Sequence, residues 1–248
     1  MRIGIIGCGY IGNVIVENFK DEIQACYDRN SKKTKKIDKS LKKTVSCTLE
    51  EFIAMDLDLV VESASVKAVR EIVPQTLENG KDVLIMSVGA LADDQLLSEL
   101  KKSASENNCR IYIPHGAVGG LDAIRAASLV DIEKVVLITR KNPDSLGLNV
   151  IKEKTVFEGP ASEAIKKFPQ NVNVSVAVSI AAGKEAEVRI IADPSVDTNI
   201  HEIYLKGAFG KINMLFNNFP SENKRTSMLA ALSAVNMIKS LKSEIFIY

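Results

Sequence analysis

The chain has 248 residues, which at roughly 150 residues per domain corresponds to about one and a half domains. Its apolar share of 46% and charged share of 25% exclude a disordered chain, a collagen-like fibre and a disulfide-stapled miniprotein. The 32 basic and 31 acidic residues leave a net charge of +1, so the chain has no basic excess for binding nucleic acid.

In the first half, short β-branched runs alternate with longer helical patterns, which is typical of a parallel sheet with crossover helices. The predicted strands are Arg2–Ile6, Ile23–Tyr27, Leu57–Glu62, Asp82–Met86 and Arg110–Ile113, the last taken as a sixth strand. The predicted helices are Ile11–Phe19, Ser31–Lys42, Thr48–Met55 and Ala92–Asn107, together with a helix that Ser65 caps, that runs through Val73 with a kink at Pro74, and that stops at Gly80. Thr48 and Glu51 have the spacing of a capping box. We therefore expect an α/β fold with a Rossmann-type, doubly wound parallel sheet of six strands.

The pattern changes after Pro114. A glycine-rich turn, 116–120, precedes a short helix from Leu121, and a final helix is predicted over Lys224–Leu241. The predicted strands between them are Lys134–Thr139, Glu187–Ile191, His201–Lys206 and Lys211–Phe216, the last two joined as a hairpin across Gly207–Gly210. These elements predict a smaller α+β domain with an open mixed or antiparallel sheet. We place the domain boundaries at 1–113 with 221–248, and at 114–220.

Cysteine spacing, apolar stretches and local charge also predict the location of the protein and what it does not bind. The four cysteines have no spacing of a zinc knuckle or a redox dithiol, so we expect reduced thiols and no metal site. No apolar stretch approaches the ~18 residues of a membrane span. The lysine-rich segment 28–43 is interpreted as a solvated helix face, because it has no interleaved aromatic residues. We expect a cytoplasmic protein that binds neither membranes nor nucleic acid.

A glycine motif between the first predicted strand and helix indicates a dinucleotide site. The segment Gly7-Cys8-Gly9-Tyr10-Ile11-Gly12 fits G-x-G-x-x-G, in which the glycines allow a tight turn, a close approach of a pyrophosphate and close helix packing. The backbone amides at the helix N-terminus favour phosphate binding. We expect Gly7, Gly9, Tyr10, Ile11 and Gly12 to bind the cofactor.

The ends of the next strands add further cofactor candidates. Asp28 ends the second strand, where a carboxylate binds ribose hydroxyls and favours NAD. Arg29 and Lys32 lie beside it and could partly neutralise a 2′-phosphate, so NADP stays possible; an ordinary turn role for Asp28 also stays open. Small residues follow two other strands, at the edge where this fold binds ligands: Ser63, Ala64, Ser87, Val88 and Gly89.

The chain has only two histidines, His115 and His201. Imidazole titrates near neutrality, which suits proton exchange with an amine, a hydroxyl or an imine. From the residues alone, either histidine could instead be structural.

Several segments together resemble the L-aspartate dehydrogenases. They are Gly7–Gly12, Ser87–Leu91, Gly116–Ala123, Asn171–Val174, Ala192–Pro194 and Asn199–Ile203. The resemblance implies a nucleotide-binding domain, a second domain that shapes the substrate site and forms a homodimer, and a last helix that returns to the first domain. It also implies that Ala117 and Asn173, with Asn171 nearby, contact NAD and that His201 is the catalytic histidine. His115 stands where the family is expected to have a small residue, so its role stays open.

The same resemblance implies oxidation of L-aspartate, a small dicarboxylate amino acid, to iminoaspartate and on to oxaloacetate and ammonia, feeding quinolinate and NAD biosynthesis. Three alternatives stay open. A homoserine dehydrogenase shares the pattern of the first half, as does a dihydrodipicolinate reductase, which would carry a paired-histidine motif absent here. A protein that binds NAD(H) as a sensor without turnover is the third.

Overall fold

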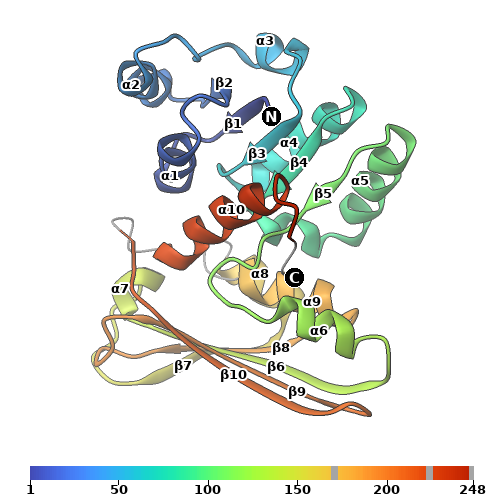
Figure 1. Ribbon diagram of the computed structural model, residues 1–248. Helices are drawn as coiled ribbons and strands as arrows, with labels where there is room; N and C mark the ends of the chain where they lie inside the picture. Colours follow the sequence, from blue (N-terminus) through green and yellow to red (C-terminus); the bar gives the residue numbers. More distant parts are fainter. Residues whose placement is uncertain (169–172, 222–225, 246–248) are drawn as a thin grey trace. The chain divides into compact units, whose positions relative to one another are not determined.

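The computed structural model describes residues 1–168, 173–221 and 226–245. The chain divides into two compact units, 1–114 with 234–242 and 115–233 with 243–248. Each unit is built on one five-stranded sheet, called sheet A in the first unit and sheet B in the second (Figure 1). The domain boundaries given above stay a prediction.

Sheet A is wholly parallel, with the strand order β2-β1-β3-β4-β5. Its strands are β1 (Ile3–Ile6), β2 (Ile23–Tyr27), β3 (Leu59–Glu62), β4 (Asp82–Ile85) and β5 (Ile111–Tyr112). The predicted α/β class and the Rossmann-type sheet are therefore confirmed. The central strands β1 and β3 are buried at every position, as expected for a parallel sheet covered on both faces.

The predicted count of six strands is wrong, because Arg110–Ile113 contains the fifth strand and not the sixth. An isolated parallel bridge joins Cys26 of β2 to Ser46 at the outer edge of the sheet. The amide of Cys26 donates to Val45 and the amide of Cys47 donates back to Cys26, at 2.6 and 3.3 Å. The edge of the sheet beside β2, where a sixth strand would pair, thus holds a single bridge. One bridged residue is too short to produce an alternating pattern in the sequence.

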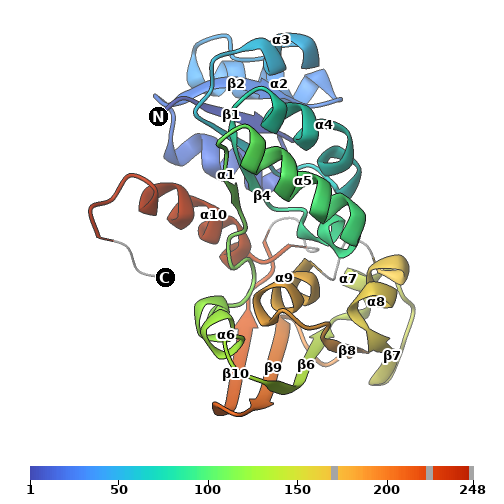
Figure 2. The ribbon, with the colours of Figure 1, turned by 90° about the vertical axis from the view of Figure 1, so that its right-hand side faces the viewer.

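Helices follow the strands as the sequence predicts. They are α1 (Tyr10–Asn18), α2 (Ser31–Leu41), α3 (Leu49–Ala54), α4 (Val66–Glu78), the 3₁₀ turn η1 (Val88–Ala92) and α5 (Asp94–Glu106). The capping box is confirmed, since Glu51 accepts from the amide of Thr48 at 2.8 Å and Thr48 accepts from that of Glu51 at 3.2 Å. Figures 1 and 2 show α4 and α5 together on one face of sheet A and α1 on the other.

Sheet B is mixed, with the order β10-β9-β6-β8-β7; β6 and β8 are parallel and the other pairs antiparallel. Its strands are β6 (Ile132–Lys141), β7 (Lys154–Pro160), β8 (Glu187–Ala192), β9 (Asn199–Gly207) and β10 (Gly210–Asn218). The β9–β10 hairpin has its predicted turn between Gly207 and Gly210. Strand β7 was not predicted, and β6 extends two residues beyond its predicted end at Thr139.

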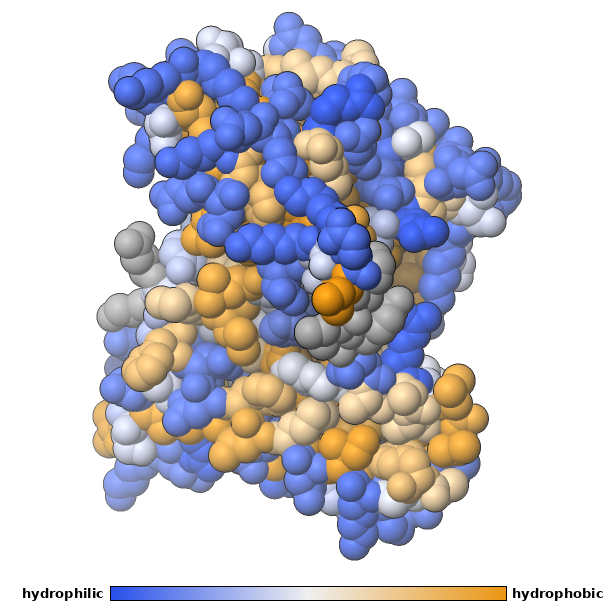
Figure 3. Space-filling view, in the orientation of Figure 1, coloured by the Kyte–Doolittle hydropathy of each residue, from blue (hydrophilic) through white to orange (hydrophobic). Residues whose placement is uncertain are grey.

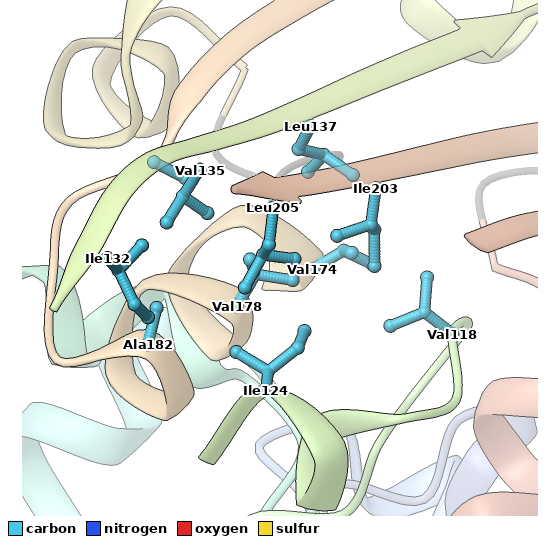
Figure 4. Close-up of a cluster of buried hydrophobic side chains, with 11 residues drawn as sticks. Val118, Ile124, Ile132, Val135, Leu137, Val174, Val178, Ala182, Ile203 and Leu205 are labelled. Carbon is cyan, nitrogen blue, oxygen red and sulfur yellow. The ribbon is translucent and has the colours of Figure 1, made fainter. Parts of the chain in front are cut away.

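One face of sheet B is covered by α6 (Leu121–Ala127), α8 (Ala161–Lys167) and α9 (Asn173–Ala182), as Figures 1 and 2 show. The core on this side joins β6 and β9 to α6 and α9. Figure 4 shows Leu137 and Ile203 of the strands facing Val174 and Val178 of α9, with Ile124 of α6 beside them. The remaining helices are α7 (Pro143–Leu146) and α10 (Met228–Ser240), which begins four residues after its predicted start. In the part of the chain that the structure describes, no helix is long and apolar enough to span a membrane.

Candidate active site

The glycine-rich segment of the first unit forms a tight loop between β1 and α1. Gly7 has a φ of +92°, and a Cβ there would lie 2.6 Å from the backbone of Ala64. A Cβ on Gly12 would collide with the carbonyl oxygen of Gly7. Around Gly9, in contrast, no atom lies within 4 Å of a Cβ position. There is thus no room for a side chain at Gly7 and Gly12, whereas the space beside Gly9 is free. This arrangement fits a phosphate group that approaches the N-terminus of α1.

Three polar side chains form hydrogen bonds to the backbone of this loop. Asn13 donates from Nδ2 to the carbonyls of Cys8 and Gly9, at 3.0 and 2.7 Å. Ser63, after β3, donates from Oγ to the carbonyl of Gly7 at 2.8 Å. Asp28, after β2, accepts from the amide of Cys8 at 2.9 Å. Asn13 was missed from the sequence, although an amide side chain one position after the motif is a signal for such a bond.

Asp28 lies where a ribose is expected, and its carboxylate is already partly engaged. One oxygen accepts from Cys8 and the other from the amide of Asn30 at 2.8 Å. A carboxylate offers about four acceptor positions, so capacity for hydroxyl groups remains. Lys33 lies 3.5 Å away, whereas Arg29 is exposed and Tyr10 and Ile11 are half-buried at the start of α1. Among the described residues, Lys33 is the cation that forms an ion pair with Asp28, and the roles given to Arg29 and Lys32 stay predictions.

A buried carboxylate, Glu62, joins the ends of β3 and β4. It is 0% exposed and accepts four hydrogen bonds, from the amides of Ala64 (2.8 Å), Ser65 (2.9 Å) and Ser87 (3.0 Å) and from the hydroxyl of Ser87 (2.9 Å). Burial raises the pKa of Glu62, and these four bonds oppose that rise. The candidates Ser63, Ala64, Ser87, Val88 and Gly89 thus lie in two loops that one side chain holds together.

In the second unit, the glycine-rich turn is tied to strand β10. The carbonyl of Ala117 accepts from Nδ2 of Asn218 at 2.7 Å. His115 forms a hydrogen bond through Nδ1 to the carbonyl of Val118, within its own turn. Asn173 is half-buried at the first position of α9, and the predicted contact Asn171 lies outside the described residues.

His201 is buried on β9, directly opposite Thr139 of β6, and is only 2% exposed. Its Nδ1 atom lies 3.0 Å from Oγ1 of Thr139. Among the described residues, none forms a hydrogen bond to Nε2. Burial, with a contribution from the positive charge of Lys141, lowers the pKa of His201 to about 3. The imidazole is therefore neutral at physiological pH, and its Nε2 atom is the one left to exchange a proton.

Lys141 lies in the same buried row, two residues beyond Thr139 on β6, and is 4% exposed. Burial lowers the pKa of its ammonium group to about 8. The sequence reasoning missed Lys141 because its predicted strand ended at Thr139. The signal that could have found it is the alternation of the strand, since positions 135, 137, 139 and 141 share one face. In the described residues, no group of three His, Cys, Asp or Glu side chains could hold a metal ion.

Comparisons with known proteins match the two parts of the chain to two different domain models. A model of the NAD-binding domain of homoserine dehydrogenase matches residues 7–114, and a model of the C-terminal domain of aspartate dehydrogenase matches residues 122–241. Among solved structures, a homoserine dehydrogenase from Thiobacillus denitrificans has a TM-score of 0.63, at 14% identity over 97% of this chain and 73% of its own. That likeness concerns the fold alone. The fold and the first of these models define an NAD(P)-dependent dehydrogenase.

Full-length relatives give the family. An L-aspartate dehydrogenase of Methanosarcina barkeri is 45% identical over 99% of this chain and 98% of its own, and one of Methanothermobacter thermautotrophicus is 43% identical over 100% and 98%. The crystal structure of aspartate dehydrogenase from Thermotoga maritima has a TM-score of 0.84 at 32% identity, covering 100% of this chain and 99% of its own. The chain belongs to the L-aspartate dehydrogenase family, whose members are NAD(P)-dependent amino-acid dehydrogenases.

Proposed function

We propose that this protein oxidises L-aspartate to iminoaspartate with NAD as the hydride acceptor. The full-length similarity to L-aspartate dehydrogenases carries the proposal, and the buried, neutral His201 supports it. NAD, when bound, would supply the acceptor for the hydride that leaves Cα; the amine nitrogen would form the C=N bond, and His201 would take up the proton that the nitrogen loses. Addition of water then gives oxaloacetate and ammonia, or the imine leaves for quinolinate synthesis.

The cofactor preference follows from Asp28. Its carboxylate would accept hydrogen bonds from ribose hydroxyls, whereas a 2′-phosphate would meet a like charge. Lys33 at 3.5 Å offsets only part of that repulsion. NAD is therefore the proposed cofactor and NADP the alternative. Gly7, Gly9, Gly12 and the loops held by Glu62 would bind it, together with Ala117, Asn173 and Asn171 of the second unit.

The activity is tested by following NADH formation with a panel of amino and hydroxy acids, with NAD and NADP in parallel. We expect turnover with L-aspartate and a higher kcat/KM with NAD. Turnover with homoserine alone would favour the homoserine dehydrogenase reading. Tight NADH binding without activity towards any substrate, in either direction, would favour an NAD(H)-sensing protein.

The role of His201 is tested by His201→Ala. A general acid or base contributes about 10²- to 10⁴-fold in rate, so kcat should fall by that factor while the Kd of NADH changes little. His115→Ala is the companion variant. If the bond to Val118 is the whole role of His115, turnover should fall far less. Unchanged turnover in His201→Ala would remove His201 from the mechanism.

We also propose that the protein forms a homodimer through the uncovered face of sheet B. Eight of the nine exposed large hydrophobic side chains in the described residues belong to the second unit, and Figure 3 shows hydrophobic groups over this part. On the uncovered face, a hollow of about 360 Å³ is lined by side chains that include Val136, Ile138, Glu202, Tyr204, Asn213 and Leu215. Sedimentation equilibrium tests the dimer, and Leu215→Glu should dissociate it. A monomeric wild-type protein at micromolar concentration would contradict the proposal.

A further inference from the structure

The covered face of sheet B has an apolar end and a polar end. Alternate residues of β9 face this side, and in the direction of the strand's start they are Leu205, Ile203, His201 and Asn199. The apolar end packs against α9 (Figure 4). At the polar end, the register places Asn218 of β10 opposite Asn199. Asn199 is 3% exposed and Asn218 is 9% exposed, so the polar end holds two buried amide side chains beside the buried imidazole.

The two amide side chains differ in their hydrogen bonds. Asn218 is engaged, because its Nδ2 atom donates to the carbonyl of Ala117 at 2.7 Å. Within residues 1–168, 173–221 and 226–245, no hydrogen bond reaches the side-chain amide of Asn199, as is the case for Nε2 of His201. Neither group is sealed from solvent, in contrast to the enclosed and unpaired Oγ of Ser103 in α5. A small polar ligand can therefore reach both.

The fold makes no use of the Asn199 amide. A polar group that loses most of its water and gains no hydrogen bond in return destabilises the folded chain. Asn217 shows the usual alternative, because it is exposed on β10 and lies opposite Ile200, on the other face of the sheet. The place of Asn199 is better explained by what its amide can bind beside His201 than by stability.

We propose that the side-chain amide of Asn199 donates a hydrogen bond to a carboxylate of the substrate and holds the substrate beside His201. This inference rests on the proposed function for the identity of the substrate, a dicarboxylate amino acid. Two residues along a strand span about 7 Å, so the substrate amine can meet Nε2 of His201 while a carboxylate meets Nδ2 of Asn199. A carboxylate is a charged acceptor, and hydrogen bonds to charged groups are stronger than those between neutral ones.

The test uses succinate, a dicarboxylate without an amino group, which cannot be oxidised at a C–N bond. Its Kd for the NADH-loaded protein is measured by calorimetry for wild type, Asn199→Ala, Asn199→Asp and the exposed control Asn217→Ala. Loss of a hydrogen bond to a charged group weakens binding by about 10-fold or more, which we expect for Asn199→Ala. Asn199→Asp should bind at least 100-fold more weakly than wild type, because a near-isosteric carboxylate repels the ligand. The control should change by less than twofold.

Three further measurements separate this role from others. The Kd of NADH should be the same in all four proteins, and the melting temperature of Asn199→Ala should equal that of wild type, because no internal hydrogen bond is lost. The KM for L-aspartate should rise in parallel with the Kd of succinate while kcat changes little, as expected for a group that binds substrate and transition state equally.

Four results would overturn the proposal. They are no succinate binding to wild type, succinate binding within threefold of wild type in folded Asn199→Ala, and equal losses of succinate and NADH binding with a lowered melting temperature. The fourth is a Kd of succinate in Asn199→Asp no weaker than in Asn199→Ala, which would mean that the amide does not donate to a carboxylate.

The outcome for Asn199 is independent of the outcome for the substrate. If wild type binds succinate through Asn199 yet does not oxidise L-aspartate, the proposed function fails and the carboxylate site stands. If wild type oxidises L-aspartate and Asn199→Ala has an unchanged KM, the proposed function stands and the site fails.

Discussion

Each unit of the molecule buries one ionisable side chain at the end of a central strand, and the two have opposite charges. Glu62 ends β3 in sheet A, and Lys141 ends β6 in sheet B. Glu62 accepts four hydrogen bonds from two loops of its own unit. Lys141 lies in a row with Thr139 and His201, and burial lowers its pKa to about 8.

The difference shows that a buried charge can hold together segments that are distant in the sequence, or can lie beside a candidate functional side chain. The carboxylate of Glu62 replaces its lost hydration with internal donors, so removing it leaves those donors without a partner. Burial disfavours the charged form of both groups, because it raises the pKa of Glu62 and lowers that of Lys141. The stability contrast therefore comes from the donors that Glu62 satisfies, which lose their acceptor when its side chain is removed, whereas removal of Lys141 removes a desolvated charge.

The largest effect on stability is expected for Glu62→Ala. Three partly buried amides and one hydroxyl lose their acceptor, and each such loss costs up to about 1–3 kcal/mol, partly recovered where water enters. We expect the free energy of unfolding to fall by about 3–5 kcal/mol in urea titrations, with a weaker Kd for NADH because both loops loosen.

Two companion variants sharpen this result. Glu62→Gln keeps one acceptor oxygen and should lose about half as much stability. Glu71→Ala removes an exposed carboxylate that pairs with Lys67 at 3.4 Å, and should change stability by less than about 0.5 kcal/mol. If Glu62→Ala is no less stable than Glu71→Ala, Glu62 does not hold the loops.

The opposite result is expected for Lys141→Met. The pKa of Lys141 is about 8 in the folded chain and 10.5 in the reference state, so below pH 8 the folded protein pays for the charge. We expect a gain of about 2–3 kcal/mol at pH 7. Between pH 8 and 10.5 the folded chain releases this proton while the unfolded chain retains it, so wild-type stability rises relative to the variant and the gain fades.

Urea titrations of both proteins at pH 7 and pH 10 measure this difference, and groups common to both cancel. Titration of the charged neighbours does not produce the same pH dependence between pH 7 and pH 10. His201 is neutral throughout this range, and Asp193 forms an ion pair with Arg140 at 2.7 Å. A difference between wild type and Lys141→Met that is the same at both pH values would mean that Lys141 is not a desolvated ammonium.

Some features of the two units could be predicted from the sequence, and others could not. The parallel sheet and the glycine loop could be predicted because periodicity and motif spacing are local properties, whereas His201 was singled out by the resemblance alone. Glu62 was seen only as the last residue of a predicted strand, because its hydrogen-bond partners come from two segments that the fold brings together. No local pattern contains that information.

The errors in the second unit have a similar cause. Arg140, Lys141 and Asn142 read as a polar end to the strand, yet β6 continues to Lys141 because its backbone pairs with β8. Strand β7 is an edge strand whose inward residues are few, so the apolar alternation is weak. Burial of a polar residue depends on tertiary pairing, and a single sequence does not encode it locally.

The smallest effect is expected for Thr139→Val, which tests whether the row in sheet B serves chemistry. The change keeps the shape of the side chain and removes the hydroxyl that meets Nδ1 of His201 at 3.0 Å. Loss of one such bond costs about 1–1.5 kcal/mol, which corresponds to roughly a tenfold lower kcat if the bond orients the ring in the transition state. The KM for L-aspartate should change little, because Thr139 acts through His201. Thr139→Ser should restore kcat, since it returns the hydroxyl. A raised KM with an unchanged kcat would instead make Thr139 part of substrate binding, and the polar end of sheet B would then be a binding surface with no positioning role for Thr139.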